Sequence, residues 1–133
     1  MNNKKYIIIL GDGAREVSIA RALSSSCNIM IHNKNNNKSA KNIQLMLLYG
    51  DNCYLPEDTL ENNIKKLINN KVNLEYIVVG NEYFFTQNLE YIENHYKIPI
   101  IGPTLAYELE LSKNYTRQIT NEVDPTFNPE YLF

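Results

Sequence analysis

The sequence predicts a three-layer α/β domain built around a parallel sheet. Short apolar runs alternate with segments of helical periodicity, several of the runs are apolar throughout, and glycine-containing turns follow them. Continuous apolar runs are typical of strands that are covered on both faces. Because strands separated by helices pair in parallel through right-handed crossovers, we expect a Rossmann-like sheet of about five strands.

The first strand is predicted at residues 6–10, an apolar run that ends at a glycine. Val17, Ala20 and Leu23 follow at helical spacing, up to a run of three serines. The second strand is predicted at residues 27–32. The Asn- and Lys-rich stretch after it has no apolar periodicity, so we expect an exposed loop there.

The third strand is predicted at residues 43–49, an apolar run that stops at Gly50. A helix is expected from Pro56, because a proline followed by two acidic residues suits a helix start. The apolar positions of that helix fall on one face, at Leu60, Ile64, Leu67 and Ile68.

The same alternation continues to the last predicted helix. Residues 74–79 and 98–101 are the fourth and fifth predicted strands. The helix between them carries its apolar positions at Phe85, Leu89, Ile92 and Tyr96, and a final helix is predicted at residues 104–119. We therefore expect one α/β domain over residues 1–121 and an extended tail over residues 122–133, where two prolines occur and periodicity is lost.

Composition narrows the class of function. The chain has 133 residues and a formal net charge of −2, which gives no general attraction to nucleic acid or to an anionic membrane. It has no apolar stretch of the roughly 18 residues that a spanning helix needs. We therefore expect a soluble, cytoplasmic protein that contacts neither nucleic acid nor membrane.

Cysteine and histidine usage gives no support for a metal site or a bound cofactor. Cys27 and Cys53 lack the spacing of a zinc site, and His32 and His95 stand alone in the sequence. We interpret both cysteines as buried, reduced thiols.

The segment most typical of a binding site is the glycine turn at residues 11–16, between the first strand and the first helix. A helix N-terminus offers unpaired N–H groups and partial positive charge, and glycines let the backbone approach an anion closely. Two further turns follow predicted strands, at residues 80–82 and 102–104. Ligands in parallel sheets bind beyond the carboxyl ends of the strands, so the three turns predict one crevice.

Taken together, the three turns resemble the N-terminal domain of phosphoribosylamine-glycine ligase, an ATP-grasp enzyme of purine biosynthesis. That family has Gly-x-Gly-Gly-Arg-Glu-His where this chain has Gly11-Asp12-Gly13-Ala14-Arg15-Glu16-Val17. Its Val-Gly-Pro-Glu resembles Val79-Gly80-Asn81-Glu82. Its Gly-Pro-Thr and Leu-Glu-x-Ser-Lys resemble Gly102-Pro103-Thr104 and Leu109-Glu110-Leu111-Ser112-Lys113. The resemblance implies the pre-ATP-grasp type of α/β domain over nearly the whole chain.

The resemblance also implies roles for single positions. Gly11, Gly13, Ala14, Arg15 and Glu16 match the loop that receives the phosphoribosyl end of the substrate, and Glu82 matches a carboxylate that holds ribose hydroxyls. The remaining matched positions are Gly80, Gly102, Pro103, Thr104, Ser112 and Lys113. Each candidate has a structural alternative: a tight turn for the glycines, a salt-bridged helix residue for Arg15, and a turn carboxylate or helix cap for Glu82.

Several positions depart from the family pattern. Asp12 places a negative charge in the loop, which disfavours phosphate unless the carboxylate points away. Ala14 and Val17 replace a glycine and a histidine, and bulky aromatics occupy residues 83–85.

In that family an ATP-grasp module follows the position of Lys113 and supplies the metal-binding carboxylates, which this sequence lacks. We therefore expect a non-catalytic domain, a pseudoenzyme that acts as a binding or self-association module and retains weak phosphoribosyl or nucleotide binding. The aromatic residues Tyr83, Phe84 and Tyr91 and the apolar residues 131–133 are candidates for a homo-oligomer interface, whereas Phe85 and Tyr96 are expected in the core. The alternative is one subunit of a split ligase that a separate ATP-grasp partner completes. A third interpretation, a nicotinamide-dependent dehydrogenase, fits the first turn alone.

Overall fold

The computed structural model describes residues 4–33, 41–102 and 113–127. Contacts between residues divide the chain into two units, Met1–Gly102 and Pro103–Phe133. The first unit contains the sheet, and the two units are described separately below.

The sheet of the first unit is parallel throughout its described part, which confirms the predicted fold class. Its strands are β1 (Lys5–Leu10), β2 (Asn28–His32), β3 (Asn73–Val79) and β4 (Ile100–Ile101), in the order β2-β1-β3-β4. The described part thus has four strands, one fewer than expected. The chain leaves β1 toward β2 on one side and reaches β3 on the other, so the carboxyl ends of β1 and β3 form a topological switch point.

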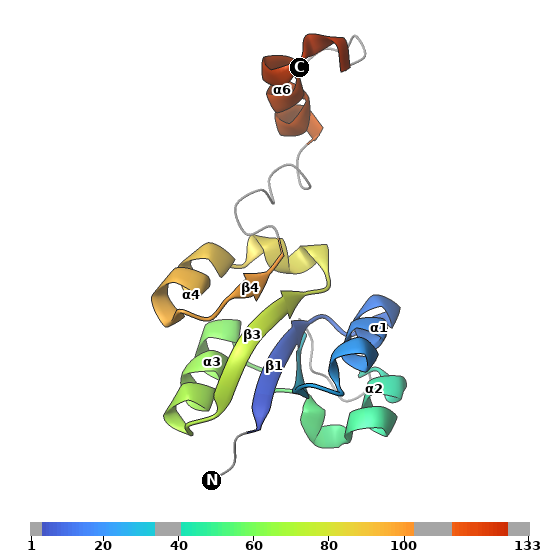
Figure 1. Cartoon of the computed structure of the whole chain (residues 1–133), viewed down its shortest axis with the longest axis vertical. Helices are drawn as coiled ribbons and strands as arrows, with labels where there is room; N and C mark the ends of the chain where they lie inside the picture. The colour runs from blue at the N-terminus through green and yellow to red at the C-terminus, as the bar shows by residue number, and fades with distance from the viewer. Residues whose placement is uncertain (1–3, 34–40, 103–112, 128–133) are drawn as a thin grey trace. The chain divides into compact units, whose positions relative to one another are not determined.

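Helices cover both faces of this sheet and give the three layers (Figure 1). Side chains of β1 alternate between the faces, as the period of a strand requires. Ile7 and Ile9 pack with α1 (Ala14–Leu23) and α2 (Ile43–Tyr49). Ile8 and Leu10 pack with α3 (Leu60–Asn69) and α4 (Leu89–Tyr96). Figure 1 shows the two pairs of helices on opposite sides of the sheet.

The predicted third strand is wrong, because residues 43–49 form α2. The Asn42 side chain accepts a hydrogen bond from the Gln44 N–H (2.9 Å) and so caps the helix start, as asparagine does well. Burial follows a helix rather than a sheet: Leu45 is fully buried, whereas Leu47 is 81% exposed. An apolar run indicated a covered strand, but half of its apolar side chains face outward. Gly50, with a φ of 83°, ends the helix.

Other boundaries shift by a few residues. The helix expected from Pro56 begins at Leu60, because the Thr59 hydroxyl accepts from the Asn62 N–H (3.1 Å) and caps it there. The helix expected around Phe85 is split into the 3-10 helix η3 (Glu82–Thr86) and α4. The fifth predicted strand is the two-residue β4.

The second unit is described as α6 (Lys113–Val123) followed by the 3-10 turn η4 (Pro125–Phe127). The Asp124 carboxylate accepts from the Thr126 backbone N–H (3.0 Å) and hydroxyl (2.7 Å), which supports the turn. The first nine residues of the predicted helix at 104–119, and residues 128–133 of the predicted tail, lie outside the described residues. No described helix is long and apolar enough to cross a membrane.

Candidate functional site

Hydrogen bonds between the ends of the strands bring two of the three predicted turns together. The Gly11 N–H donates to the His32 carbonyl (2.9 Å), and the Gly80 N–H donates to the Leu10 carbonyl (3.0 Å). These bonds join the carboxyl ends of β2, β1 and β3 at one edge. Gly102 follows β4, while Pro103 and Thr104 lie outside the described residues.

The space between the first two turns is filled by the side chain of Glu16. Glu16 is only 3% exposed, although it belongs to the first turn of α1. A Cβ built on Gly11 would lie 2.6 Å from the Glu16 Oε1 atom, and one built on Gly80 would lie 2.5 Å from its Cγ. Gly11 also has a φ of +111°, a conformation that favours glycine. Both glycines therefore leave the space that Glu16 occupies, and the conformation of its turn also favours glycine at position 11.

The start of α1 lies at the same edge and has no side-chain cap. Its N-cap is Gly13, and the helix extends over ten residues from Ala14. Uncapped N–H groups and the helix dipole together favour an anion. Arg15 adds a positive charge beside them, and its Nη1 donates to the Gly80 carbonyl (3.0 Å) across the two turns.

The negative charge of Asp12 is engaged by its neighbours. The Tyr54 hydroxyl donates to Asp12 Oδ2 (2.8 Å) and accepts from the Asn42 N–H (2.8 Å). The Asn42 side-chain amide donates to the Asp12 carbonyl (2.7 Å). Burial, together with the hydrogen bond to the Asp12 carboxylate, raises the pKa of Tyr54 well above its usual value, so the phenol stays a donor. The Asp12 carboxylate thus points to Tyr54.

The structure brings six of the candidate positions together: Gly11, Gly13, Ala14, Arg15, Glu16 and Gly80. Glu82 begins η3 directly after the second turn, but its side chain lies outside the described part. Lys113 is exposed at the start of α6 in the second unit, and Ser112 is not among the described residues.

A pocket that the sequence analysis missed opens at the carboxyl end of β2. Its volume is about 240 Å³, and we call it the His32 pocket. It is lined by His32, Asn33, Glu57, Asp58, Thr59, Leu60, Tyr83, Phe84 and Gln87. His32 could have been recognised from its place, because the last residue of a buried parallel strand faces the ligand edge.

The imidazole of His32 is buried and its tautomer follows from its neighbour Asn63. The Asn63 Nδ2 atom lies 3.3 Å from His32 Nδ1 and donates to the Pro56 carbonyl (3.0 Å). Since an amide NH₂ only donates, His32 Nδ1 accepts and Nε2 carries the proton. Burial lowers the pKa of His32, an effect that the negative charge of Asp58 partly offsets. The ring is therefore a neutral N–H donor.

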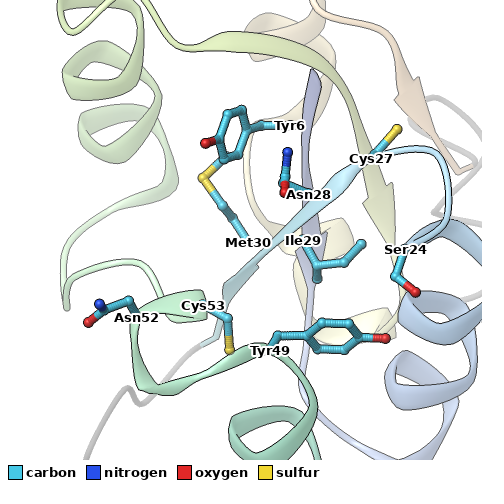
Figure 2. A pocket seen from close by; sticks show the side chains of 9 residues that line it. All are labelled: Tyr6, Ser24, Cys27, Asn28, Ile29, Met30, Tyr49, Asn52 and Cys53. Carbon is cyan, nitrogen blue, oxygen red and sulfur yellow. The ribbon is translucent and has the colours of Figure 1, made fainter. Parts of the chain in front are cut away.

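A larger cavity, of about 550 Å³, lies along the amino half of β2 (Figure 2). It is lined by Tyr6, Ser24, Cys27, Asn28, Ile29, Met30, Tyr49, Asn52 and Cys53. Both cysteines are buried and free, as predicted, and burial raises the pKa of Cys53. A thiol with a raised pKa is a poor nucleophile. The glycine turns lie at the opposite ends of the strands, so we place the candidate site there rather than in this cavity.

Within the described residues, no group of three or more His, Cys, Asp or Glu side chains could hold a metal ion. No known protein-family model and no curated protein matches the sequence. The resemblance to the ligase domain therefore stays a prediction based on the turns.

Proposed function

We propose that the first unit is a binding domain for a phosphorylated ribose, similar in role to the N-terminal domain of phosphoribosylamine-glycine ligase. The phosphate lies against the start of α1, and the sugar lies toward the turn after β3. Binding, rather than a reaction completed by this chain, is the role that the described residues support.

The observation that carries this proposal is the uncapped N-terminus of α1 at the carboxyl edge of the sheet. Arg15 supplies a cation next to it, held by the Gly80 carbonyl. Asp12, the charge that most opposes a phosphate there, is hydrogen-bonded to Tyr54 instead. An arginine and free backbone N–H groups are common phosphate ligands.

The buried Glu16 bears on which part of the ligand lies near it. Its carboxylate lies between Gly11 and Gly80 and repels a phosphate placed directly over the switch point. A carboxylate accepts hydrogen bonds from sugar hydroxyls, however. The phosphate is therefore proposed at α1, with the ribose on the side of Glu16 and Gly80.

Calorimetric titration of the chain tests this proposal. Ribose 5-phosphate should bind with a dissociation constant in the millimolar range or tighter, and ribose without phosphate should bind at least tenfold more weakly. Absence of measurable binding to ribose 5-phosphate would remove the proposed function.

A separate ATP-grasp protein could use such a domain as one subunit of a split ligase. Glycine-dependent ATP hydrolysis by a mixture of this chain and an ATP-grasp protein would favour the split ligase.

A second candidate function, self-association, is favoured by the outer face of α2. Ile43 is 66% exposed, Leu47 81% and Leu48 47%. Apolar side chains gathered on one short helix are typical of a surface that another protein covers. We propose a second copy of the chain as the partner, and sedimentation velocity tests this association.

A further inference from the structure

We propose that the His32 pocket binds the base of a purine nucleotide whose phosphate lies at the start of α1. This inference rests on the proposed function and names its ligand class. The two sites are neighbours, because the His32 carbonyl accepts from the Gly11 N–H (2.9 Å). The pocket lies on the α3 face of the sheet and α1 on the other face, so one ligand that crosses this edge would reach both sites.

The size of the pocket suits part of a ligand. Pockets that bury most of a drug-sized ligand usually measure about 300–1,000 Å³, whereas the His32 pocket measures about 240 Å³. A heterocyclic ring fits such a space, and the sugar and phosphate would extend toward Gly11.

Aromatic rings form one wall of the pocket. Phe84 is buried and Tyr83 is 39% exposed, and their rings meet edge to face with centroids 5.3 Å apart. The His32 ring contacts Phe84 at 5.7 Å between centroids. Phe84 is too deeply buried to stack on a ligand, so Tyr83 is the ring that is accessible for stacking on the flat face of a nucleobase.

The polar groups of the pocket favour a base over a phosphate. Glu57 and Asp58 line it, and their carboxylates repel an anion. Asp58 is itself engaged, because Lys66 Nζ donates to its Oδ2 atom (3.1 Å). His32 offers a neutral Nε2–H group, since Nδ1 accepts from Asn63. The ring nitrogens of a purine and the carbonyl oxygens of a pyrimidine both accept such a bond, so this donor suits a nucleobase. The stronger stacking of the larger purine on an aromatic wall favours a purine.

Titration of the full chain with three probes separates this inference from the proposed function. Adenosine 5′-monophosphate should bind at least tenfold more tightly than ribose 5-phosphate, and more tightly than uridine 5′-monophosphate. Equal affinity for adenosine 5′-monophosphate and ribose 5-phosphate would overturn the base pocket and leave the proposed function standing. Equal affinity for the two nucleotides would overturn the assignment to purines. Binding of adenosine 5′-monophosphate without any binding of ribose 5-phosphate would support the base pocket and contradict the proposed function.

Two exposed tyrosines provide a matched pair of variants. Y83A removes an aromatic wall of the pocket and should weaken adenosine 5′-monophosphate about tenfold, with ribose 5-phosphate unchanged. Y91A removes a comparable ring, 43% exposed, from α4 outside the pocket, and should change neither affinity. Circular dichroism of both variants should match that of the original chain, which tests whether they fold. Equal losses of affinity for adenosine 5′-monophosphate in the two variants, or no loss of affinity in Y83A, would overturn the inference.

Discussion

The side chain of Glu16 occupies the place that any side chain at Gly80 would need: a Cβ built on Gly80 would lie 2.5 Å from Glu16 Cγ. Glu16 lies in the first turn of α1, and Gly80 follows β3 in the chain. Their contact therefore connects the two turns that border the proposed ligand site. It also explains why glycine is required at position 80.

This contact predicts strong coupling between the two positions. G80A should cost about 1–3 kcal/mol in the free energy of unfolding, because the new methyl group overlaps the Glu16 side chain. In the background of E16A, where that side chain is absent, the same substitution should cost less than about 0.5 kcal/mol. Urea denaturation of the original chain, G80A, E16A and the double variant measures the coupling between the two positions.

G50A is the matched control for this cycle. Gly50 has a φ of 83° but no atom within 4 Å of its built Cβ. The G50A substitution strains only the backbone. It should therefore lower the free energy of unfolding by the same amount with and without E16A. Additive effects of G80A and E16A would contradict the proposed contact.

The hydrogen bond from Tyr54 to Asp12 should affect both stability and binding. Y54F removes a donor to a carboxylate and should lower the free energy of unfolding by about 1.5–3 kcal/mol. It also releases the Asp12 carboxylate beside the start of α1, so ribose 5-phosphate should bind more weakly. Denaturation and calorimetry on one preparation measure the two effects.

Y96F serves as the control, because the Tyr96 hydroxyl donates to Glu61 Oε1 (2.7 Å) far along the chain from the loop. Y96F should reduce stability and leave the affinity for ribose 5-phosphate unaltered. A variant Y54F that binds as well as the original chain would show that Asp12 has no influence on the site.

His32 should make the fold less stable in mild acid. Its pKa is lowered in the folded protein by burial, so between that pKa and about 6.5 the unfolded chain binds more protons. Stability should then be full above about pH 6.5 and fall as the pH decreases toward the folded pKa. Thermal unfolding at about pH 7.5 and about pH 5.5 measures the decline.

H32Q should flatten that pH dependence, because glutamine does not titrate and offers the same kinds of polar atoms. H95Q replaces the exposed histidine of α4 and should leave the decline in place. An identical pH dependence in H32Q and the original chain would rule out His32 as its source.

The outer face of α2 predicts concentration-dependent association. L47K replaces a side chain that is 81% exposed, so the fold should survive while the apolar surface is interrupted. Sedimentation velocity should show the original chain shifting toward a dimer as its concentration rises, and L47K should stay monomeric. V123K, at a residue that is 79% exposed in the second unit, should behave like the original chain. A monomer at every concentration would reject self-association through this face.

The sequence predicted the sheet of the first unit well. The continuous apolar run at residues 6–10 buries both faces of β1, and the predicted strand at residues 74–79, which Glu75 interrupts, coincides with β3. The prediction failed at residues 43–49, where composition alone does not separate a covered strand from a helix with an exposed apolar face. The Asn42 cap is a local signal that favours a helix, whereas the packing of Leu45 depends on tertiary structure. Tyr54 forms an isolated parallel bridge with Ile31 at the outer edge of β2.

The candidate site was predicted in part. The glycine turns at residues 11–16 and 80–82 meet as expected, since parallel strands place their carboxyl ends at one edge. The inward direction of Glu16 could not be deduced, because a glutamate in the first turn of a helix ordinarily faces solvent. The bond between Tyr54 and Asp12 joins residues 42 positions apart, and no local pattern indicates it.

The most direct test of the proposed function is the effect of G13D on binding of ribose 5-phosphate. Gly13 is the N-cap of α1 with a φ of −82°, a backbone conformation that aspartate adopts readily, and its built Cβ meets only Glu16 Oε2, at 3.1 Å. An aspartate there would cap the helix with its own carboxylate and occupy the N–H groups proposed for the phosphate. N88D adds the same charge at the N-cap of α4 and serves as the control.

We expect G13D to fold, with a thermal stability lowered by the repulsion between its carboxylate and that of Glu16. It should weaken the binding of ribose 5-phosphate at least tenfold in calorimetry, while N88D binds as the original chain does. Undiminished binding of ribose 5-phosphate by a folded G13D would contradict the placement of the phosphate at the start of α1. It would thereby contradict the proposal that the first unit is a binding domain for a phosphorylated ribose.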